Sequence, residues 1–135
     1  MRRARRRKKN STVGAAESTR SRGAAAEEAA ARFLRSHGHK ILARNFSTTA
    51  GEVDIIAADG TTICFIEVRS RGSGEFGPPH ASVRGAKQKR IRSAAATYLR
   101  RKRLGAPLCR FDVVSMVLAP GQKPGWEIEW LRNAF

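Results

Sequence analysis

Residues 51–71, GEVDIIAADGTTICFIEVRSR, decide the fold of this chain. Two runs rich in valine and isoleucine, residues 52–58 and 62–69, predict β-strands. Between them Asp59-Gly60 is a strong signal for a two-residue hairpin turn. We therefore predict an antiparallel hairpin, the most apolar in the chain, that belongs to a buried sheet.

The segments around the hairpin predict the other elements. Apolar side chains at helical spacing indicate two helices, and short apolar or alternating runs indicate three further strands. Glycines and prolines at 70–79 predict a loop of about ten residues. In chain order these elements are a helix at 23–37, a strand at 41–47, a helix at 84–103 and strands at 108–118 and 126–131. The order is α-β-β-β-α-β-β, which predicts an α/β fold.

The chain is strongly basic, because 27 Lys and Arg side chains stand against 11 Asp and Glu and give a net charge of +16. Such a charge favours a polyanionic partner, either nucleic acid or acidic lipid. Residues 1–22 hold nine of the basic side chains and almost no large apolar ones, so we predict a disordered tail there and one domain over residues 23–135. The tail is interpreted as a nucleic-acid-binding arm, a transit peptide or solubilising charge.

The sequence also bears on compartment. No apolar run approaches the roughly 20 residues of a membrane-spanning helix, and the amino end lacks the apolar segment of a secretory signal. We expect a cytoplasmic protein with no membrane partner. Cys64 and Cys109 fall in separate apolar runs, so we expect buried, reduced thiols rather than a disulfide or a zinc site.

Two acidic residues of the hairpin are predicted to converge. A turn at Asp59-Gly60 would set Asp54 opposite Phe65, which makes Asp54 and Glu67 diagonal neighbours on one face of the sheet. Two such carboxylates repel unless a cation lies between them, and their oxygens suit Mg²⁺ or Mn²⁺. Arg69 is predicted on the same face, where it could pair with a carboxylate or reach a phosphate. The alternative is a solvated face with weak surface ion pairs.

Several motifs carry a resemblance to a known family. They include residues 51–57 (GEVDIIA), 65–71 (FIEVRSR), 76–78 (FGP), 41–46 (ILARNF) and 110–114 (RFDVV). With this spacing the chain resembles the YraN-like family of bacterial proteins over nearly everything except the amino tail. That family is similar to the restriction-endonuclease-like nucleases, which implies a mixed central sheet flanked by helices.

The resemblance also implies roles for individual residues. Asp54, Glu67 and Arg69 stand at the positions of the superfamily's catalytic Asp, Glu and Lys. Glu27 is the candidate for a carboxylate from the first helix, with Glu28 as the alternative. The implied function is a metal-dependent nuclease that hydrolyses phosphodiester bonds in DNA, branched or structured DNA included, with Mg²⁺ or Mn²⁺ held by Asp54, Glu67 and Glu27.

Arg69 is a departure from the superfamily pattern, because a guanidinium cannot lose a proton to act as a base. It can still position water or stabilise negative charge on a phosphate. One alternative is therefore a non-catalytic nucleic-acid-binding protein of the same fold. Another is an interaction protein whose tail docks on ribosomal RNA or an acidic partner.

Basic residues outside the hairpin are candidate phosphate contacts. Lys87 and Arg90 lie in the first half of the second predicted helix, and Arg71 precedes the glycine-rich loop that leads into it. All three are predicted to bind nucleic acid. Few exposed aromatic residues are available for base stacking, so we expect recognition of backbone or structure, with DNA as a better candidate than RNA. A homodimer is compatible with the sequence and is not specified by it.

Overall fold

A computed structural model gives the architecture and describes residues 10–71, 83–119 and 125–135, with side chains from residue 22 onward. The described residues form, in chain order, one helix, three strands, a second helix and two further strands. The seven elements are α1 (Asn10–Ser36), β1 (Lys40–Ser47), β2 (Glu52–Asp59), β3 (Thr62–Arg71), α2 (Gly85–Arg101), β4 (Cys109–Leu118) and β5 (Trp126–Leu131).

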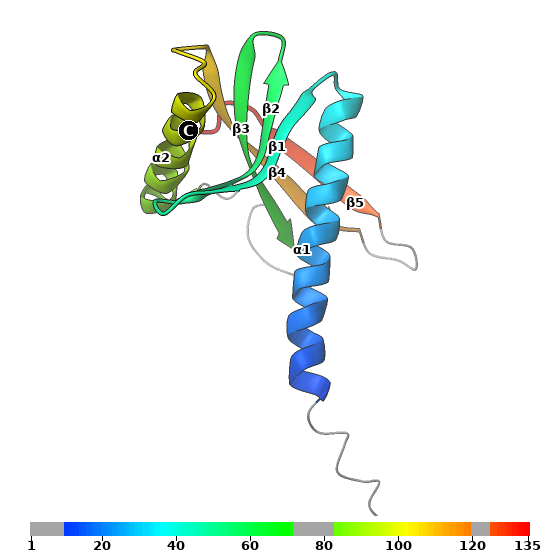
Figure 1. Cartoon of the computed structure of the whole chain (residues 1–135). Helices are drawn as coiled ribbons and strands as arrows, with labels where there is room; N and C mark the ends of the chain where they lie inside the picture. The colour runs from blue at the N-terminus through cyan, green and yellow to red at the C-terminus, as the bar shows by residue number, and fades with distance from the viewer. Residues whose placement is uncertain (1–9, 72–82, 120–124) are drawn as a thin grey trace, which may run out of the picture.

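The five strands form one mixed sheet with α1 on one side and α2 on the other (Figure 1). The strand order is β1-β2-β3-β4-β5. Neighbouring strands are antiparallel except β3 and β4, which are parallel. A parallel pair needs a long crossover connection, and α2 lies in it. The predicted α/β class, element order and helix-flanked mixed sheet are confirmed.

Each face of the sheet has its own apolar core. The core under α1 contains alanines and Leu34 of the helix packed on alternate residues of the strands, among them Ile55 and Ile66. The core under α2 contains Ile91, Ala94, Ala95 and Tyr98 of that helix. On the sheet side it is built from Val53, Ile56, Ile63, Phe65 and Val113. Since β2 and β3 are covered on both faces, they read as nearly continuous apolar runs.

The first helix begins earlier than predicted. It starts at Asn10 rather than at residue 23, so residues 10–22 are helical and the prediction of a disordered tail is wrong for them. This stretch has no proline and several strong helix formers, and these allow the helix to continue upstream of the part that packs on the sheet. Residues 1–9 lie outside the described residues, and the single-domain boundary at residue 23 stays a prediction.

The register of the hairpin also differs from the prediction. Asp59 pairs with Thr62 and Ile55 pairs with Ile66, so the two turn residues are Gly60 and Thr61. Gly60 has φ +59°, which suits a two-residue turn with glycine first. The predicted pairing was therefore wrong by two residues. Because side chains alternate with a period of two, this error leaves the paired residues 55–59 and 62–66 on their predicted faces.

Three smaller expectations have mixed outcomes. Cys64 is buried as predicted, but Cys109 at the start of β4 is exposed, so the prediction of a second buried thiol is wrong. The predicted loop at 70–79 begins later, because β3 continues to Arg71; the rest of it lies outside the described residues. Over the described part of the chain, neither helix is long and apolar enough to span a bilayer.

Candidate functional site

The strand β2 changes its facing at Asp54. Val53 packs in the core under α2, whereas Ile55, two residues on, packs in the core under α1. In a regular strand, residues two apart share a face. Continuing the β1–β2 register places Asn45 across from Asp54, and Asn45 has φ +52°, in the left-handed region. This local twist turns the Asp54 side chain toward β3 instead of into either core.

The Asp54 carboxylate is hydrogen-bonded to the backbone of β3. The N–H of Val68 donates a hydrogen bond of 2.8 Å to Oδ2 of Asp54. Continuing the β2–β3 register one residue beyond Ile55–Ile66 places Asp54 across from Glu67. Burial raises the pKa of Asp54 to about 8, and the hydrogen-bonding, negatively charged side chain of Glu67 adds to the rise. The structure thus brings the two predicted acids together.

Glu67 is the buried member of the pair, with 7% of the residue exposed. The ammonium of Lys87, on α2, lies in ion-pair contact with Oε2 of Glu67. That contact lacks hydrogen-bond geometry, and within the described chain Oε2 accepts no hydrogen bond. A cation of the chain therefore already lies against Glu67, and the Lys87 side chain that carries it is 50% exposed.

The two candidate carboxylates of α1, Glu27 and Glu28, have different interactions in the structure. After burial and Glu67, the negative charge of Glu27 makes a minor contribution to the raised pKa of Asp54. Glu28 pairs instead with Arg44 at 2.6 Å, and this hydrogen bond holds the pKa of Glu28 below its ordinary value. Glu27 is thus better placed than Glu28, although within residues 10–71, 83–119 and 125–135 no three acidic, His or Cys side chains are close enough to hold a metal together.

Two carboxylates with a costly shared charge nevertheless suit a divalent cation. The pair offers hard oxygen donors, and Glu67 Oε2 is buried without a hydrogen bond from the described residues. Placing negative charge in such a site is unfavourable without a positive partner. Asp54 and Glu67 would hold the ion, and Glu27 remains a candidate for a more distant role.

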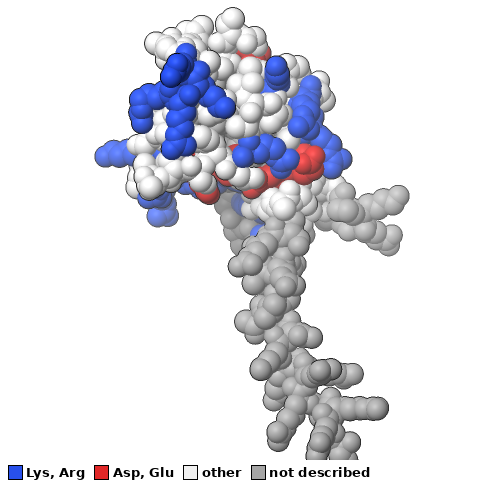
Figure 2. Space-filling model, viewed as in Figure 1, with Lys and Arg blue, Asp and Glu red and all other residues white. Residues whose placement is uncertain are grey.

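The predicted basic residues are distributed around the acids. Arg69 and Arg71 are half-buried near the end of β3 and pair with Ser115 and Val117 of β4. Lys87 and Arg90 are exposed on the first half of α2. Lys and Arg side chains cover much of the face seen in Figure 2, where acidic side chains form a narrow band.

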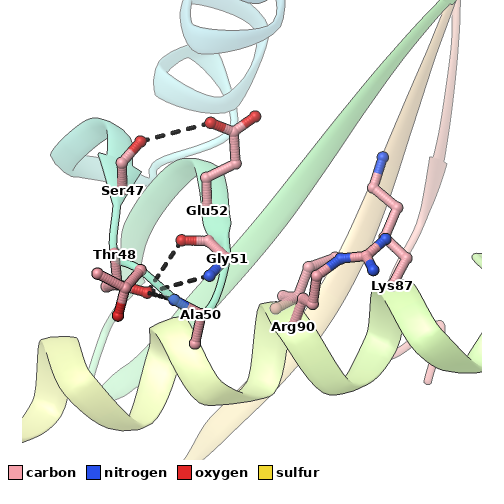
Figure 3. A pocket seen from close by; sticks show the side chains of 9 residues that line it. Ser47, Thr48, Ala50, Gly51, Glu52, Lys87 and Arg90 are labelled. Atoms are coloured by element: carbon pink, nitrogen blue, oxygen red, sulfur yellow. Dashed lines mark hydrogen bonds between the residues drawn. The ribbon is translucent and has the colours of Figure 1, made fainter.

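A pocket of about 390 Å³ lies next to the acid pair, between the β1–β2 loop and α2. Asp54 and Glu67 do not line the pocket. Lys87 does, and because Lys87 also contacts Glu67, its side chain connects the pocket with the acid pair. Figure 3 shows the Lys87 and Arg90 side chains rising from the same side of α2 toward the strands. The remaining lining is Ser47, Thr48, Thr49, Ala50, Gly51, Glu52 and Ile91.

Two features of the site were not predicted from the sequence. The Lys87–Glu67 pair joins a helix and a strand twenty residues apart, and nothing in the local pattern indicates it. The pocket depends on how the loop after β1 meets α2. A glycine in that loop, Gly51, was the available signal: an added Cβ would lie 2.5 Å from the Arg90 carbonyl oxygen.

Comparison with known sequences shows the family of this chain. Residues 26–116 match the model of the family described as "Uncharacterised protein family UPF0102". The chain belongs to this family. A UPF0102 protein of Geobacter metallireducens is 45% identical over 116 residues, which cover 86% of this chain and 93% of the relative. UPF0102 proteins of Solibacter usitatus (44% identity, 84% of each chain) and Moorella thermoacetica (45%, 86% of this chain and 96% of the relative) are similarly close. The UPF0102 match confirms the YraN-like resemblance and includes both acids, Lys87 and Arg90.

Proposed function

We propose that this UPF0102 protein is a metal-dependent nuclease that hydrolyses phosphodiester bonds in DNA at Asp54 and Glu67. One observation carries the proposal: two carboxyl groups meet in a largely buried position, and the pKa of Asp54 is raised to about 8 there. Acidic pairs with strongly raised pKa values are costly, and they are characteristic of functional sites.

Asp54 and Glu67 supply the negative oxygens of the site. The Val68 N–H orients Asp54, and the β2–β3 register sets Glu67 across from it, so both positions depend on rigid strands. When bound, Mg²⁺ or Mn²⁺ polarises a phosphate and lowers the pKa of a water molecule. Attack of a water molecule on phosphorus would form a new P–O bond and break the P–O bond to the sugar oxygen, and that oxygen would leave with a proton taken up from solvent while the water gives up one of its own.

Cations of the chain complete the site. Lys87 contacts Glu67 while half of its side chain is exposed, so its ammonium can exchange the carboxylate for a phosphate oxygen. Arg69, two residues after Glu67 on β3, adds a permanent positive charge that favours phosphate binding. These two side chains would stabilise the negative charge that builds up on the phosphate during attack.

A non-catalytic nucleic-acid-binding protein is the second candidate. It is favoured by the lysine that already neutralises Glu67 and by the absence of a third metal-binding carboxylate over the described ranges. In that case the site would bind phosphate through Lys87 and Arg69 and would not hydrolyse it.

The test is a cleavage assay with the full-length protein on labelled linear and branched DNA, with Mg²⁺ or Mn²⁺. Asp54→Asn and Glu67→Gln keep the size of each side chain, and each should lower the cleavage rate by about 10²–10³-fold. Glu127→Gln is the matched control, since Glu127 is an exposed acid of the same sheet, on β5, that belongs neither to the acid pair nor to the pocket lining. Cleavage that survives both substitutions would place the activity elsewhere. Binding without cleavage by the wild type would support the second candidate.

A further inference from the structure

The pocket beside the acids has the size of a ligand site. Its volume of about 390 Å³ falls in the range of small-molecule pockets, about 300–1,000 Å³. That volume accommodates a phosphate group with its sugar. The β1–β2 loop forms one wall and the first half of α2 forms the other (Figure 3).

The loop wall is held by its own hydrogen bonds. The Thr48 hydroxyl oxygen accepts hydrogen bonds of 3.1 Å from the N–H groups of Ala50 and Gly51, and the Thr48 N–H donates one of 2.7 Å to the Gly51 carbonyl. Gly51 lies directly against the backbone of Arg90, where no side chain would fit. The pocket is therefore a preformed hollow whose two walls touch at one glycine.

The charge of the lining favours an anion. Arg90 and Lys87 are three residues apart on α2 and so share a helix face. Lys87 reaches Glu67, whereas no ion pair or hydrogen bond among the described residues engages the Arg90 side chain. Glu52 is the acid in the lining, and its carboxylate accepts a long hydrogen bond of 3.4 Å from Ser47. An unengaged guanidinium in a polar hollow is suited to bidentate binding of a phosphate.

We propose that this pocket binds a backbone phosphate of the nucleic-acid strand, next to the phosphate that is cleaved. Arg90 is its main contact, and Lys87 lies between the pocket and Glu67. This inference rests on the proposed function, because it places the second phosphate on the strand that crosses Asp54 and Glu67. It implies a hold on the sugar–phosphate backbone without selection among bases.

The experiment measures DNA binding by fluorescence anisotropy with EDTA present, so that metal-dependent cleavage does not interfere, over a series of KCl concentrations. Arg90→Gln should weaken binding about tenfold and reduce the slope of log K against log salt by about 0.9, one phosphate contact. Arg90→Lys should restore most of the slope. Lys89→Gln is the matched control, because Lys89 is an exposed cation of the same helix outside the pocket.

Thermal melts of each variant establish that the fold is intact. Equal losses for Arg90→Gln and Lys89→Gln would overturn the proposal, as would a loss confined to particular base sequences or no binding by the wild type. If Arg90→Gln alone weakens binding while the wild type shows no cleavage with Mg²⁺, hydrolysis is refuted and the phosphate pocket stands.

Discussion

Asp54 and Asp112 are both acids of the sheet, the first half-buried and the second fully buried, and their surroundings are opposite. Asp112, fully buried on β4, accepts hydrogen bonds from Arg110 Nε to both oxygens, from Trp130 Nε1 and from the Asn133 N–H, all of 2.9–3.1 Å. Asp54 accepts one N–H and meets a second carboxyl group. A carboxylate that is surrounded by donors stabilises a fold, whereas two adjacent carboxyl groups with a raised pKa are characteristic of functional sites.

The surroundings of Asp112 tie together distant parts of the chain. Arg110 also donates a hydrogen bond of 3.0 Å to Asp59 at the end of β2 and contacts His39 just before β1. With Trp130 of β5 the cluster joins three strands, β2, β4 and β5, and the residue that precedes β1. We interpret it as structural.

The largest effect is expected from Asp112→Ala. It leaves the Arg110 side chain, 17% exposed, without its buried partner, and breaking a buried pair in this way costs about 3–5 kcal/mol of unfolding free energy. Urea denaturation measures the loss. Asp59→Ala is the matched control, because the Asp59 side chain is 42% exposed and solvent screens its ion pair with Arg110, so its loss should be clearly smaller than that of Asp112→Ala. Similar small losses for both would remove the distinction between the two acids.

Asp54→Asn should stabilise the protein, whereas Asp112→Ala should destabilise it. The pKa of Asp54 rises from 3.8 to about 8 on folding, so between these pH values the folded protein keeps a proton that the unfolded chain has lost. Wild-type stability should therefore fall as pH rises from about 4 to about 8. Asparagine cannot ionise, so the variant should melt several degrees above the wild type at pH 8 with EDTA present. The difference should shrink at pH 5.

Glu52→Gln, which changes an exposed acid of the same strand, should leave the pH dependence as it is. A variant Asp54→Asn that is no more stable than the wild type at pH 8 would mean that Asp54 is well accommodated, like Asp112.

Gly51→Ala should lower the stability of the protein by a smaller amount. The disturbance should stay on the side of the sheet where the acid pair lies. The added methyl would meet the Arg90 carbonyl oxygen at 2.5 Å, and forcing such contacts apart costs about 1–3 kcal/mol. Gly85→Ala is the control, since nothing lies within 4 Å of its added methyl; it should be neutral or slightly stabilising. Thermal melts compare the two. Equal melting temperatures would show that the loop yields without cost.

The sequence predicts the order of elements well because apolar periodicity dominates local structure. It also predicts that Asp54 and Glu67 lie close together, which the structure shows, but it does not predict the change of facing of β2 at Asp54. Prediction from the sequence fails where residues far away in the chain determine the local geometry or the contacts of a side chain. The left-handed Asn45 that turns β2 at Asp54, the Lys87 contact and the donors around Asp112 all come from other elements. The early start of α1 was missed because low apolar content was interpreted as disorder, although helix formers continue through it.

The central claim is that Asp54 and Glu67 form one site for a divalent cation, and Mn²⁺ titration of the metal-free protein by calorimetry tests it most directly. We predict that the wild type and Glu52→Gln bind Mn²⁺ alike, while Glu67→Gln weakens binding at least about tenfold, as loss of a ligand does. Equal Mn²⁺ affinity in all three proteins, or no binding by the wild type at millimolar Mn²⁺, would contradict the claim.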